Sequence, residues 1–300
     1  MDNYYIQIKE HIINNEIYSK VKDYSKERYK IATYFEIGKL LTLAGKHYGE
    51  GIIKKYSIKL TNEFGKKYST RLLYKMIQFY NFILKEKMPT LSAQLSWSHY
   101  EEIFKLENIS KINYYIKITI EQNLSVRELR NKIKSNEYER LPKDTKLKLQ
   151  NNNDIEIKDI IKDPIIIKNT NNIEILKEKT LQKLILEDIP SFLEELGPGF
   201  TFIKNEYKIK IGDTYNYIDL LLFNYEFNCF IVIELKITEL KKEHIGQIEI
   251  YMNYIDNNIK KIHHDKTIGI IICKKDNKFI IEYSSDKRIL CREYLLIPSK

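Results

Sequence analysis

The stretch 214–236, TYNYIDLLLFNYEFNCFIVIELK, decides the fold of the second half of the chain. It has the pattern of two apolar β-strands joined by a polar turn at 225–228. Asp219 lies inside the first strand, and Glu234 and Lys236 lie at the end of the second. Charged side chains in such apolar runs are costly unless they are paired or bind a metal ion.

The register of this hairpin follows from the turn. If residues 225–228 form the turn, Asp219 faces Glu234 across the strand pair, with side chains roughly 5 Å apart on the same face. Because strand side chains alternate, Lys236 shares that face. The sequence therefore predicts two carboxylates that can hold one divalent cation, beside a lysine that can orient or deprotonate a water. A buried structural salt-bridge cluster is the alternative interpretation.

Asp219 followed by Glu234-x-Lys236 resembles the PD-(D/E)XK nuclease signature, and the wider sequence is similar to the YhcG family of two-domain bacterial nucleases. The resemblance covers nearly the whole chain. The matching segments are FLEELGPGF at 192–200, IDLL at 218–221, VIELK at 232–236, GQ at 246–247 with Tyr251, TIGI at 267–270 and QLSWSHY at 94–100. The chain departs from the family pattern at Ile218, where the signature name has proline, and at Asn205-Glu206, where Arg-Gln is expected.

This resemblance implies a metal-dependent nuclease that hydrolyses DNA phosphodiester bonds, in bacterial DNA processing or genome defence. Mg²⁺ is the expected cofactor, with Mn²⁺ as a substitute. Asp219 and Glu234 are the expected metal ligands, and Lys236 is the group beside the water. Glu195 is a candidate for a further ligand, or else a surface helix acid. Gln247 is a candidate to orient the lysine or contact phosphate, or else a polar residue on a core helix.

Two other functions stay open at this point. One is a catalytically silent DNA-binding or assembly subunit that keeps the nuclease fold. The other is a nuclease directed at RNA, because the signature specifies phosphodiester chemistry better than it specifies the polymer.

Charge is divided unevenly along the chain. Residues 1–150 hold 28 Lys and Arg against 17 Asp and Glu, whereas residues 151–300 hold 22 against 24. The window 51–100 is the most basic, with 9 Lys and Arg against 2 acids. This division fits a nucleic-acid-binding half joined to a metal-dependent half, with compositional drift as the alternative.

The basic window has the outline of a helix-turn-helix. A helix over 52–64, a turn over 65–68 and a helix over 70–85 are predicted, and a later helix over 125–139 begins at a capping box of Ser125 and Glu128. The alternative is a solvated basic face. The candidate DNA contacts on these helices are Lys66, Lys67, Arg71, Lys75, Arg127 and Arg130.

We therefore expect an α+β chain of two domains. Residues 1–141 form an all-helical, basic domain with a helix-turn-helix-like or winged-helix-like DNA-binding unit, and 142–173 form an Asn-rich linker. Residues 174–300 form an α/β PD-(D/E)XK restriction-endonuclease-like domain. Its expected element order is α-β-β-β-α-β-β, with one kinked helix over 176–196 and a last strand at 279–283.

Three cysteines are widely spaced and match no CxxC metal pattern, which favours a reduced protein. The start of the chain lacks a signal-peptide pattern, and its apolar runs are far shorter than the roughly 20 residues that span a bilayer. We expect a cytoplasmic protein with no membrane partner. DNA is the expected partner, with branched or structured DNA among the candidates, and a homodimer is a further candidate assembly.

Overall fold

The computed structural model describes residues 2–20, 26–49, 51–85, 95–151, 153–169, 174, 177–282 and 286–298. The chain divides into two compact units, Met1–Tyr138 and Glu139–Lys300, and each is described by itself.

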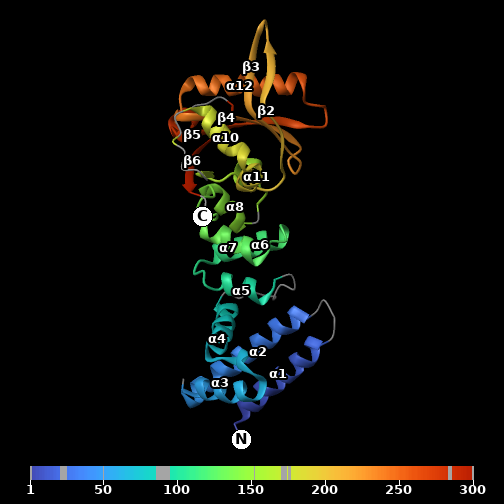
Figure 1. The fold of residues 1–300 in the computed structure, drawn as a ribbon, viewed down its shortest axis with the longest axis vertical. Helices are drawn as coiled ribbons and strands as arrows, with labels where there is room; N and C mark the ends of the chain where they lie inside the picture. The colour runs from blue at the N-terminus through green and yellow to red at the C-terminus, as the bar shows by residue number, and fades with distance from the viewer. Residues whose placement is uncertain are drawn as a thin grey trace. The chain divides into compact units, whose positions relative to one another are not determined.

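The first unit is helical over its described residues (Figure 1). The predicted helices at 52–64 and 70–85 are confirmed, and a short 3₁₀ turn separates them. A helix-turn-helix role in binding DNA stays a prediction, and Gln94 of the QLSWSHY motif lies outside the described residues. The elements are α1 (Asn3–Lys20), α2 (Lys26–Tyr48), α3 (Gly51–Phe64), η1 (Lys66–Tyr68), α4 (Thr70–Lys85), α5 (Trp97–Ile103), α6 (Ile109–Glu121) and α7 (Val126–Lys134).

Close packing of α2 against α4 depends on a glycine. A Cβ atom on Gly38 would lie 2.2 Å from the main-chain oxygen of Met76. Real side chains do not approach a backbone oxygen so closely, so only glycine lets the two helix backbones meet here. This contact positions α4, which carries two of the predicted DNA contacts.

The second unit is an α/β fold around a six-stranded mixed sheet of order β1-β6-β5-β4-β3-β2. Strands β2, β3 and β4 are antiparallel, whereas β4, β5, β6 and β1 are parallel. Its elements are α8 (Lys143–Asn151), α9 (Ile157–Ile160), β1 (Ile165–Asn169), α10 (Glu178–Glu187), α11 (Ile189–Leu196), β2 (Phe200–Ile211), β3 (Thr214–Asn224), β4 (Cys229–Glu239), α12 (Lys242–Asn258), β5 (Asp265–Lys275), α13 (Lys278–Glu282) and β6 (Ile289–Pro298).

The segment 142–173 is not a linker, which corrects the expectation from its asparagines. It contains α8, α9 and β1, and β1 pairs with β6 from Ile165↔Tyr294 onward. Burial explains the difference, because Ile165 and Ile167 are 0% and 4% exposed and belong to the core. Asn171 and Asn172 lie outside the described residues.

Two further expectations about the second unit were wrong. The predicted single helix over 176–196 is two helices, because Asp188 ends α10 and caps α11 by accepting a hydrogen bond from Ser191 N. The predicted strand at 279–283 is the short helix α13, and the last strand is β6. A short apolar run such as Phe279–Ile281 does not distinguish a strand from a helix.

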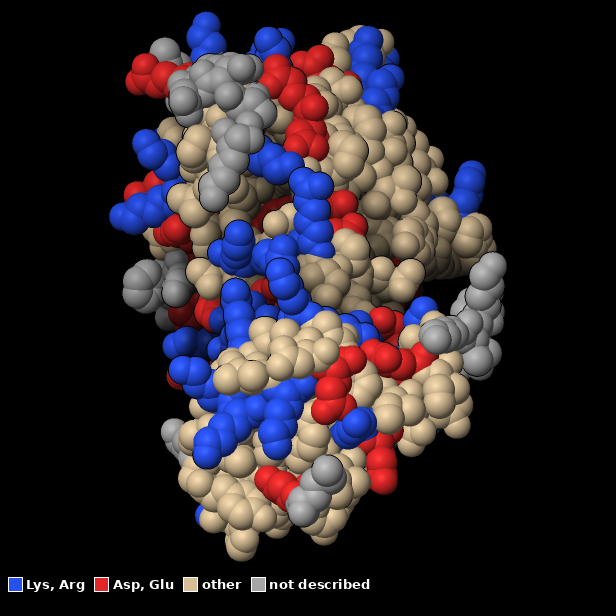
Figure 2. Space-filling view, turned by 60° about the horizontal axis from the view of Figure 1, so that its bottom comes forward, with Lys and Arg blue, Asp and Glu red and all other residues tan. Residues whose placement is uncertain are grey.

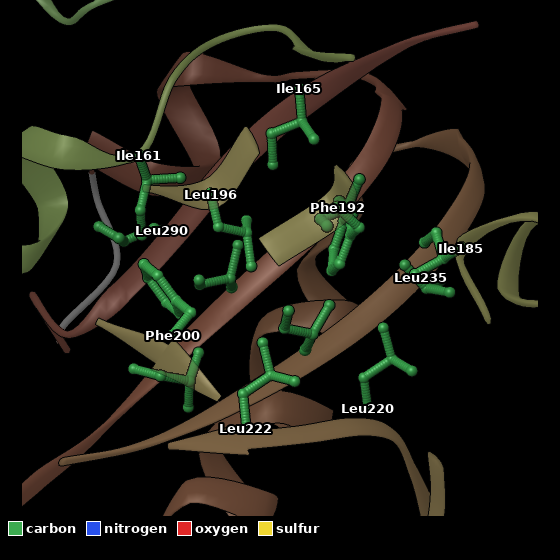
Figure 3. Packing of buried hydrophobic residues seen from close by; sticks show 14 of the residues in the cluster. Ile161, Ile165, Ile185, Phe192, Leu196, Phe200, Leu220, Leu222, Leu235 and Leu290 are labelled. Carbon is green, nitrogen blue, oxygen red and sulfur yellow. The ribbon is translucent and has the colours of Figure 1, made fainter. Parts of the chain in front are cut away.

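The sheet is covered on both faces. On one face α10 and α11 pack through Ile185, Phe192 and Leu196 against the strands, as Figure 3 shows. On the other face α12 packs through residues such as Ile248 and Met252. Strand β4 lies between these two cores, with its first eight residues buried.

The cysteines are free thiols buried in the second unit, as expected for Cys229 and Cys273. Among the described residues, no helix combines the length and the apolar character needed to cross a bilayer.

Substitutions at two glycines of α2 test the helix packing of the first unit. Gly38→Ala should lower the free energy of unfolding by about 1–3 kcal/mol, because its Cβ overlaps the backbone of α4. Gly45→Ala is the matched control, since nothing lies within 4 Å of its added Cβ, and it should stabilise by up to about 1 kcal/mol. Urea unfolding followed by circular dichroism measures both. Equal stability of the two variants would contradict this packing.

Candidate active site

The β3–β4 hairpin has the predicted turn and register. Strand β3 ends at Asn224 and β4 begins at Cys229. Facing pairs run from Asn224↔Cys229 to Leu220↔Ile233, as the turn at 225–228 requires. The same register carried one step further would place Asp219 opposite Glu234, but the described pairing ends at Leu220.

Asp219 leaves the strand ladder at this point. Its Oδ2 atom accepts a hydrogen bond of 2.8 Å from the backbone N of Leu235 on β4. Its main-chain oxygen accepts one of 3.0 Å from Nε2 of Gln182, a buried residue of α10. A side-chain carboxylate therefore takes a position next to β4 where a ladder carbonyl would otherwise bond. This arrangement fixes the Asp219 carboxylate between the two strands.

Glu234 and Lys236 project from the same face of β4. They are 3% and 7% exposed, whereas Leu235 between them lies in the core on the other face. The Lys236 Nζ donates to Oε1 of Glu234 at 2.9 Å. The other carboxylate oxygen of Glu234, Oε2, is buried and has no hydrogen-bond partner. An unpartnered buried carboxylate oxygen is rare and marks a position that an ion can fill.

The site holds more negative than positive charge, which favours binding of a cation. Burial, followed by the charge of Asp219, raises the pKa of Glu234 to about 7, against the hydrogen bond from Lys236. Burial also raises the pKa of Asp219, opposed by the Leu235 amide and the charge of Lys236. Burial lowers the pKa of Lys236, but the hydrogen bond to Glu234 and the charges of the surrounding acids together outweigh this and leave the pKa raised. One lysine thus balances two buried carboxylates incompletely.

Helix α10 brings a third acid that the sequence did not single out. Glu178 Oε2 lies 3.5 Å from Lys236 Nζ, and its side chain is 44% exposed. Gln182, which holds Asp219, follows one turn later on the same helix. In the sequence, the polar Gln182 among the apolar Leu181, Leu184 and Ile185 could have indicated that this helix contacts the site.

Helix α12, on the face of the sheet opposite α10 and α11, carries the predicted site residue Gln247. Gln247 Nε2 donates to the Tyr251 hydroxyl at 3.0 Å, and Tyr251 is 5% exposed. Burial raises the pKa of Tyr251, and the charges of Glu234 and Asp219 raise it further. Gln247 thus contacts Tyr251, whose hydroxyl lies within the electrostatic influence of both acids. Burial lowers the pKa of His244 on the same helix, and the charge of Lys236 lowers it further.

The residues present fit a divalent cation. Over the described part of the chain, no group of three or more His, Cys, Asp and Glu is arranged to hold a metal. Mg²⁺, however, is commonly held by one or two carboxylates, with waters and substrate phosphates as its other ligands. Asp219 and the open Oε2 of Glu234 supply that number of hard oxygen ligands.

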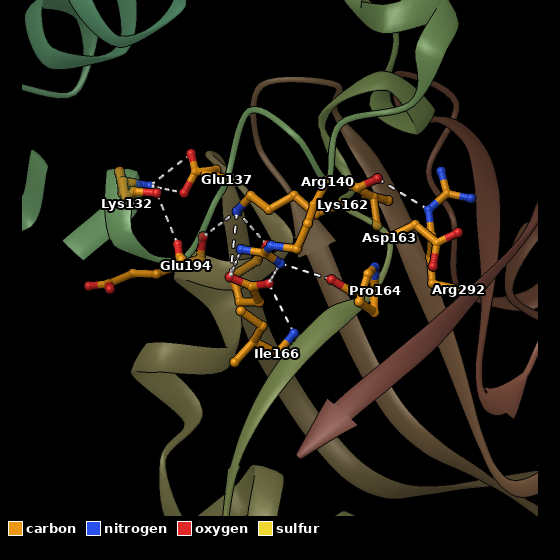
Figure 4. Close-up of polar contacts among 12 residues, drawn as sticks. Lys132, Glu137, Arg140, Lys162, Asp163, Pro164, Ile166, Glu194 and Arg292 are labelled. Atoms are coloured by element: carbon orange, nitrogen blue, oxygen red, sulfur yellow. Dashed lines mark hydrogen bonds and ion pairs between the residues drawn. The ribbon is translucent and has the colours of Figure 1, made fainter. Parts of the chain in front are cut away.

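Glu195 has other partners, and Figure 4 labels three of them, Arg140, Lys162 and Ile166. Its carboxylate pairs with the Arg140 guanidinium and accepts a hydrogen bond of 3.0 Å from the backbone N of Ile166 on β1. Lys162 adds an ion pair at 3.9 Å and donates to the main-chain oxygen of Glu195 at 2.6 Å. Glu195 thus ties α11 to the start of β1, and the acid that α10 and α11 bring to Lys236 is Glu178.

Half of the predicted DNA contacts in the first unit are in ion pairs. Glu16 pairs with Lys67, Glu101 with Lys75 at 2.7 Å, and Glu102 with Arg130 at 2.8 Å. On the face drawn in Figure 2, acidic side chains likewise lie among the Lys and Arg side chains. The exposed members of the set without an ion pair among the described residues are Lys66, Arg71 and Arg127.

Comparison with known proteins agrees with both units. Residues 158–300 match the YhcG PDDEXK nuclease domain, and residues 5–140 match the DUF1016 N-terminal domain. "Putative nuclease YhcG" of Escherichia coli (strain K12) is 24% identical over 284 residues, which is 81% of this chain and 76% of that protein.

Solved structures are only distantly similar. A repair endonuclease from Pyrococcus abyssi has 17% identity and a TM-score of 0.29, covering 41% of this chain and 48% of that chain. The EndoMS–dsDNA2 complex has 21% identity and a TM-score of 0.30, covering 44% and 51%. This chain thus spans about half the length of each, and scores this low do not support a comparison of sites.

The two family matches together cover most of both units. The chain is homologous to YhcG and consists of a DUF1016 N-terminal domain followed by a YhcG PDDEXK nuclease domain.

Proposed function

We propose that this protein is a Mg²⁺-dependent endonuclease that hydrolyses phosphodiester bonds of DNA, with Mn²⁺ as a substitute ion, in bacterial DNA processing or genome defence. The observation that carries the proposal is the cluster of half-buried Asp219 with buried Glu234 and Lys236, in which Oε2 of Glu234 has no hydrogen-bond partner. A purely structural ion cluster would satisfy its buried oxygens internally. An open carboxylate oxygen beside a second, half-buried acid suits a cation that comes from outside.

Asp219 and Glu234 would hold the ion. When bound, a divalent cation polarises the phosphate and makes a neighbouring water more acidic. Lys236 keeps Glu234 oriented through Oε1 and offers a positive charge where negative charge grows on the phosphate. Glu178 holds Lys236 from the side of α10, and Gln247 fixes the Tyr251 hydroxyl next to the acids.

The first unit would supply further DNA contacts. Lys66, Arg71 and Arg127 are exposed and can meet phosphates directly. Lys67, Lys75 and Arg130 would have to exchange a carboxylate for a phosphate, which lowers their net contribution. The net charge of +9 for the whole chain favours a polyanionic substrate.

Cleavage by single variants tests the proposal. Asp219→Asn, Glu234→Gln and Lys236→Ala should each reduce Mg²⁺-dependent cleavage of plasmid DNA by at least about 100-fold, because the first two weaken the proposed cation site and the third removes positive charge beside the reacting phosphate. DNA affinity in EDTA should stay unchanged. Glu226→Gln, an exposed acid of the β3–β4 turn, is the control and should cleave like wild type. Full activity in all three variants, or cleavage of RNA alone, would refute a DNA nuclease centred on this trio.

Stability of the metal-free protein should depend on pH through Glu234. Its pKa is 4.5 in the reference state and about 7 in the fold, so the folded protein holds a proton that the unfolded chain has released. The free energy of unfolding should therefore fall as pH rises through this window, by at most about 3 kcal/mol.

Urea unfolding in EDTA across this pH range measures the effect. Glu234→Gln should remove this component of the pH dependence, and Mg²⁺ should restore wild-type stability at about pH 8 but not that of the variant. Identical profiles for wild type and Glu234→Gln, with no effect of Mg²⁺ on either, would contradict the assigned charge state and cation site.

A further inference from the structure

Strands β2 and β3 continue beyond the sheet as a two-stranded arm. They pair as far as Ile211↔Thr214, where Gly212, with a φ of 58°, and Asp213 form the turn. Strand β4 pairs with β3 only as far as Leu220. Figure 1 shows the ends of β2 and β3 extending past α12. The outer part of the hairpin therefore has no third strand beside it.

One face of this arm presents two lysines and two tyrosines. Lys208 pairs across the strands with Tyr217, and Lys210 pairs with Tyr215. These four residues lie on one face because residues two apart on a strand point the same way. The tyrosines are 53% and 52% exposed, and both lysines are exposed.

The opposite face of the arm is held by the protein. Ile209 and Ile218 are 1% and 0% exposed and belong to the core that α12 covers. The arm is thus anchored on one side and open on the other.

The lysines are free to bind an anion. Among the described residues, no acidic side chain forms an ion pair with Lys208 or Lys210. Instead, the Lys208 Nζ lies 3.7 Å and the Lys210 Nζ 6.0 Å from the centre of the Tyr215 ring. Lysines on an edge strand are sometimes present simply to prevent pairing with another sheet. Exposed aromatic rings would favour such association, so that role does not explain the tyrosines. Rings for stacking beside free ammonium groups suit a nucleic-acid strand.

We propose that this face of the β2–β3 arm binds an unpaired strand of DNA. Rings two residues apart are roughly 6.8 Å from each other, about twice the spacing of bases stacked along one strand of B-form DNA. Bases that rest on both rings must therefore be unstacked from each other, and base faces are available only where pairing is broken. The lysines would meet the phosphates.

The arm lies close in sequence to the candidate active site. Tyr217 precedes Asp219 by two residues on the same strand, so the arm continues directly into the part of β3 that carries a candidate metal ligand. The inference rests on the proposed nuclease function and makes it more specific. It assigns as substrate a DNA that contains a single-stranded segment, such as a branch, flap or gap.

Binding of the full-length protein in EDTA tests this without cleavage. Fluorescence anisotropy compares a labelled single-stranded oligonucleotide with the same sequence as a blunt duplex. Tyr215→Ala/Tyr217→Ala should weaken single-strand binding at least about fivefold and leave duplex binding unchanged, because loss of stacking affects only unpaired bases. Tyr215→Phe/Tyr217→Phe keeps the rings and should bind like wild type. Circular dichroism melts verify that each variant is folded.

The two lysines should affect a second quantity, the salt dependence of binding. Lys208→Ala/Lys210→Ala should reduce the slope of log affinity against log salt by about 1.4 on the single strand. The matched control is Lys261→Ala/Lys266→Ala, which removes the same charge from exposed positions near the start of β5 and should leave the slope and the affinity unchanged. This pair of variants keeps the test decisive if the double tyrosine variant does not fold.

Three results would overturn the inference: unchanged single-strand binding in the tyrosine and lysine variants, equal losses on single strand and duplex, or a change of oligomeric mass by light scattering in place of a binding loss. The last would make the arm a contact between copies of this chain. Cleavage of DNA by wild type with arm variants that bind normally would refute the arm alone. Arm-dependent binding by a protein that cleaves nothing would refute the nuclease alone.

Discussion

The hydrogen bond from the Leu235 amide to the carboxylate of Asp219 is the interaction on which the site depends. It replaces a ladder bond between β3 and β4 and so places a charged group where a neutral carbonyl belongs. Gln182 completes the arrangement by binding the carbonyl that Asp219 turns away from the ladder. These two contacts hold the side chain and the main chain of Asp219 in place where the β3–β4 pairing ends.

Strand β4 is enclosed by two apolar cores, one under α10 and α11 and one under α12, so its charged groups are costly to bury without a partner. The cores hold the strand rigidly while Lys236 neutralises part of the acid charge. Burial, together with the acid charge that Lys236 does not neutralise, raises the pKa of Glu234, and Oε2 of Glu234 has no partner. Both features favour binding of a cation. The match to the YhcG PDDEXK nuclease domain covers residues 158–300, the part of the chain that contains this strand.

Local pattern was enough to predict the turn at 225–228, the register down to Leu220 and the shared face of Glu234 and Lys236, because strand alternation and hairpin geometry act over a few residues. The interruption at Asp219 was not predictable in this way, since it depends on Gln182, 37 residues away. The break between α10 and α11 decides that Glu178, not Glu195, meets Lys236. Strand β1 likewise becomes a strand only through β6, near the other end of the unit.

The most direct test of the account is a crystal structure of the wild-type protein soaked with Mn²⁺, in which anomalous scattering locates the ion. The account predicts a Mn²⁺ peak bonded to the Asp219 carboxylate and to Oε2 of Glu234, with the Leu235 amide still bonded to Asp219 and Lys236 still bonded to Oε1 of Glu234. A Mn²⁺ ion bound elsewhere, with Lys236 satisfying both oxygens of Glu234, would contradict it and leave the trio as a structural ion cluster.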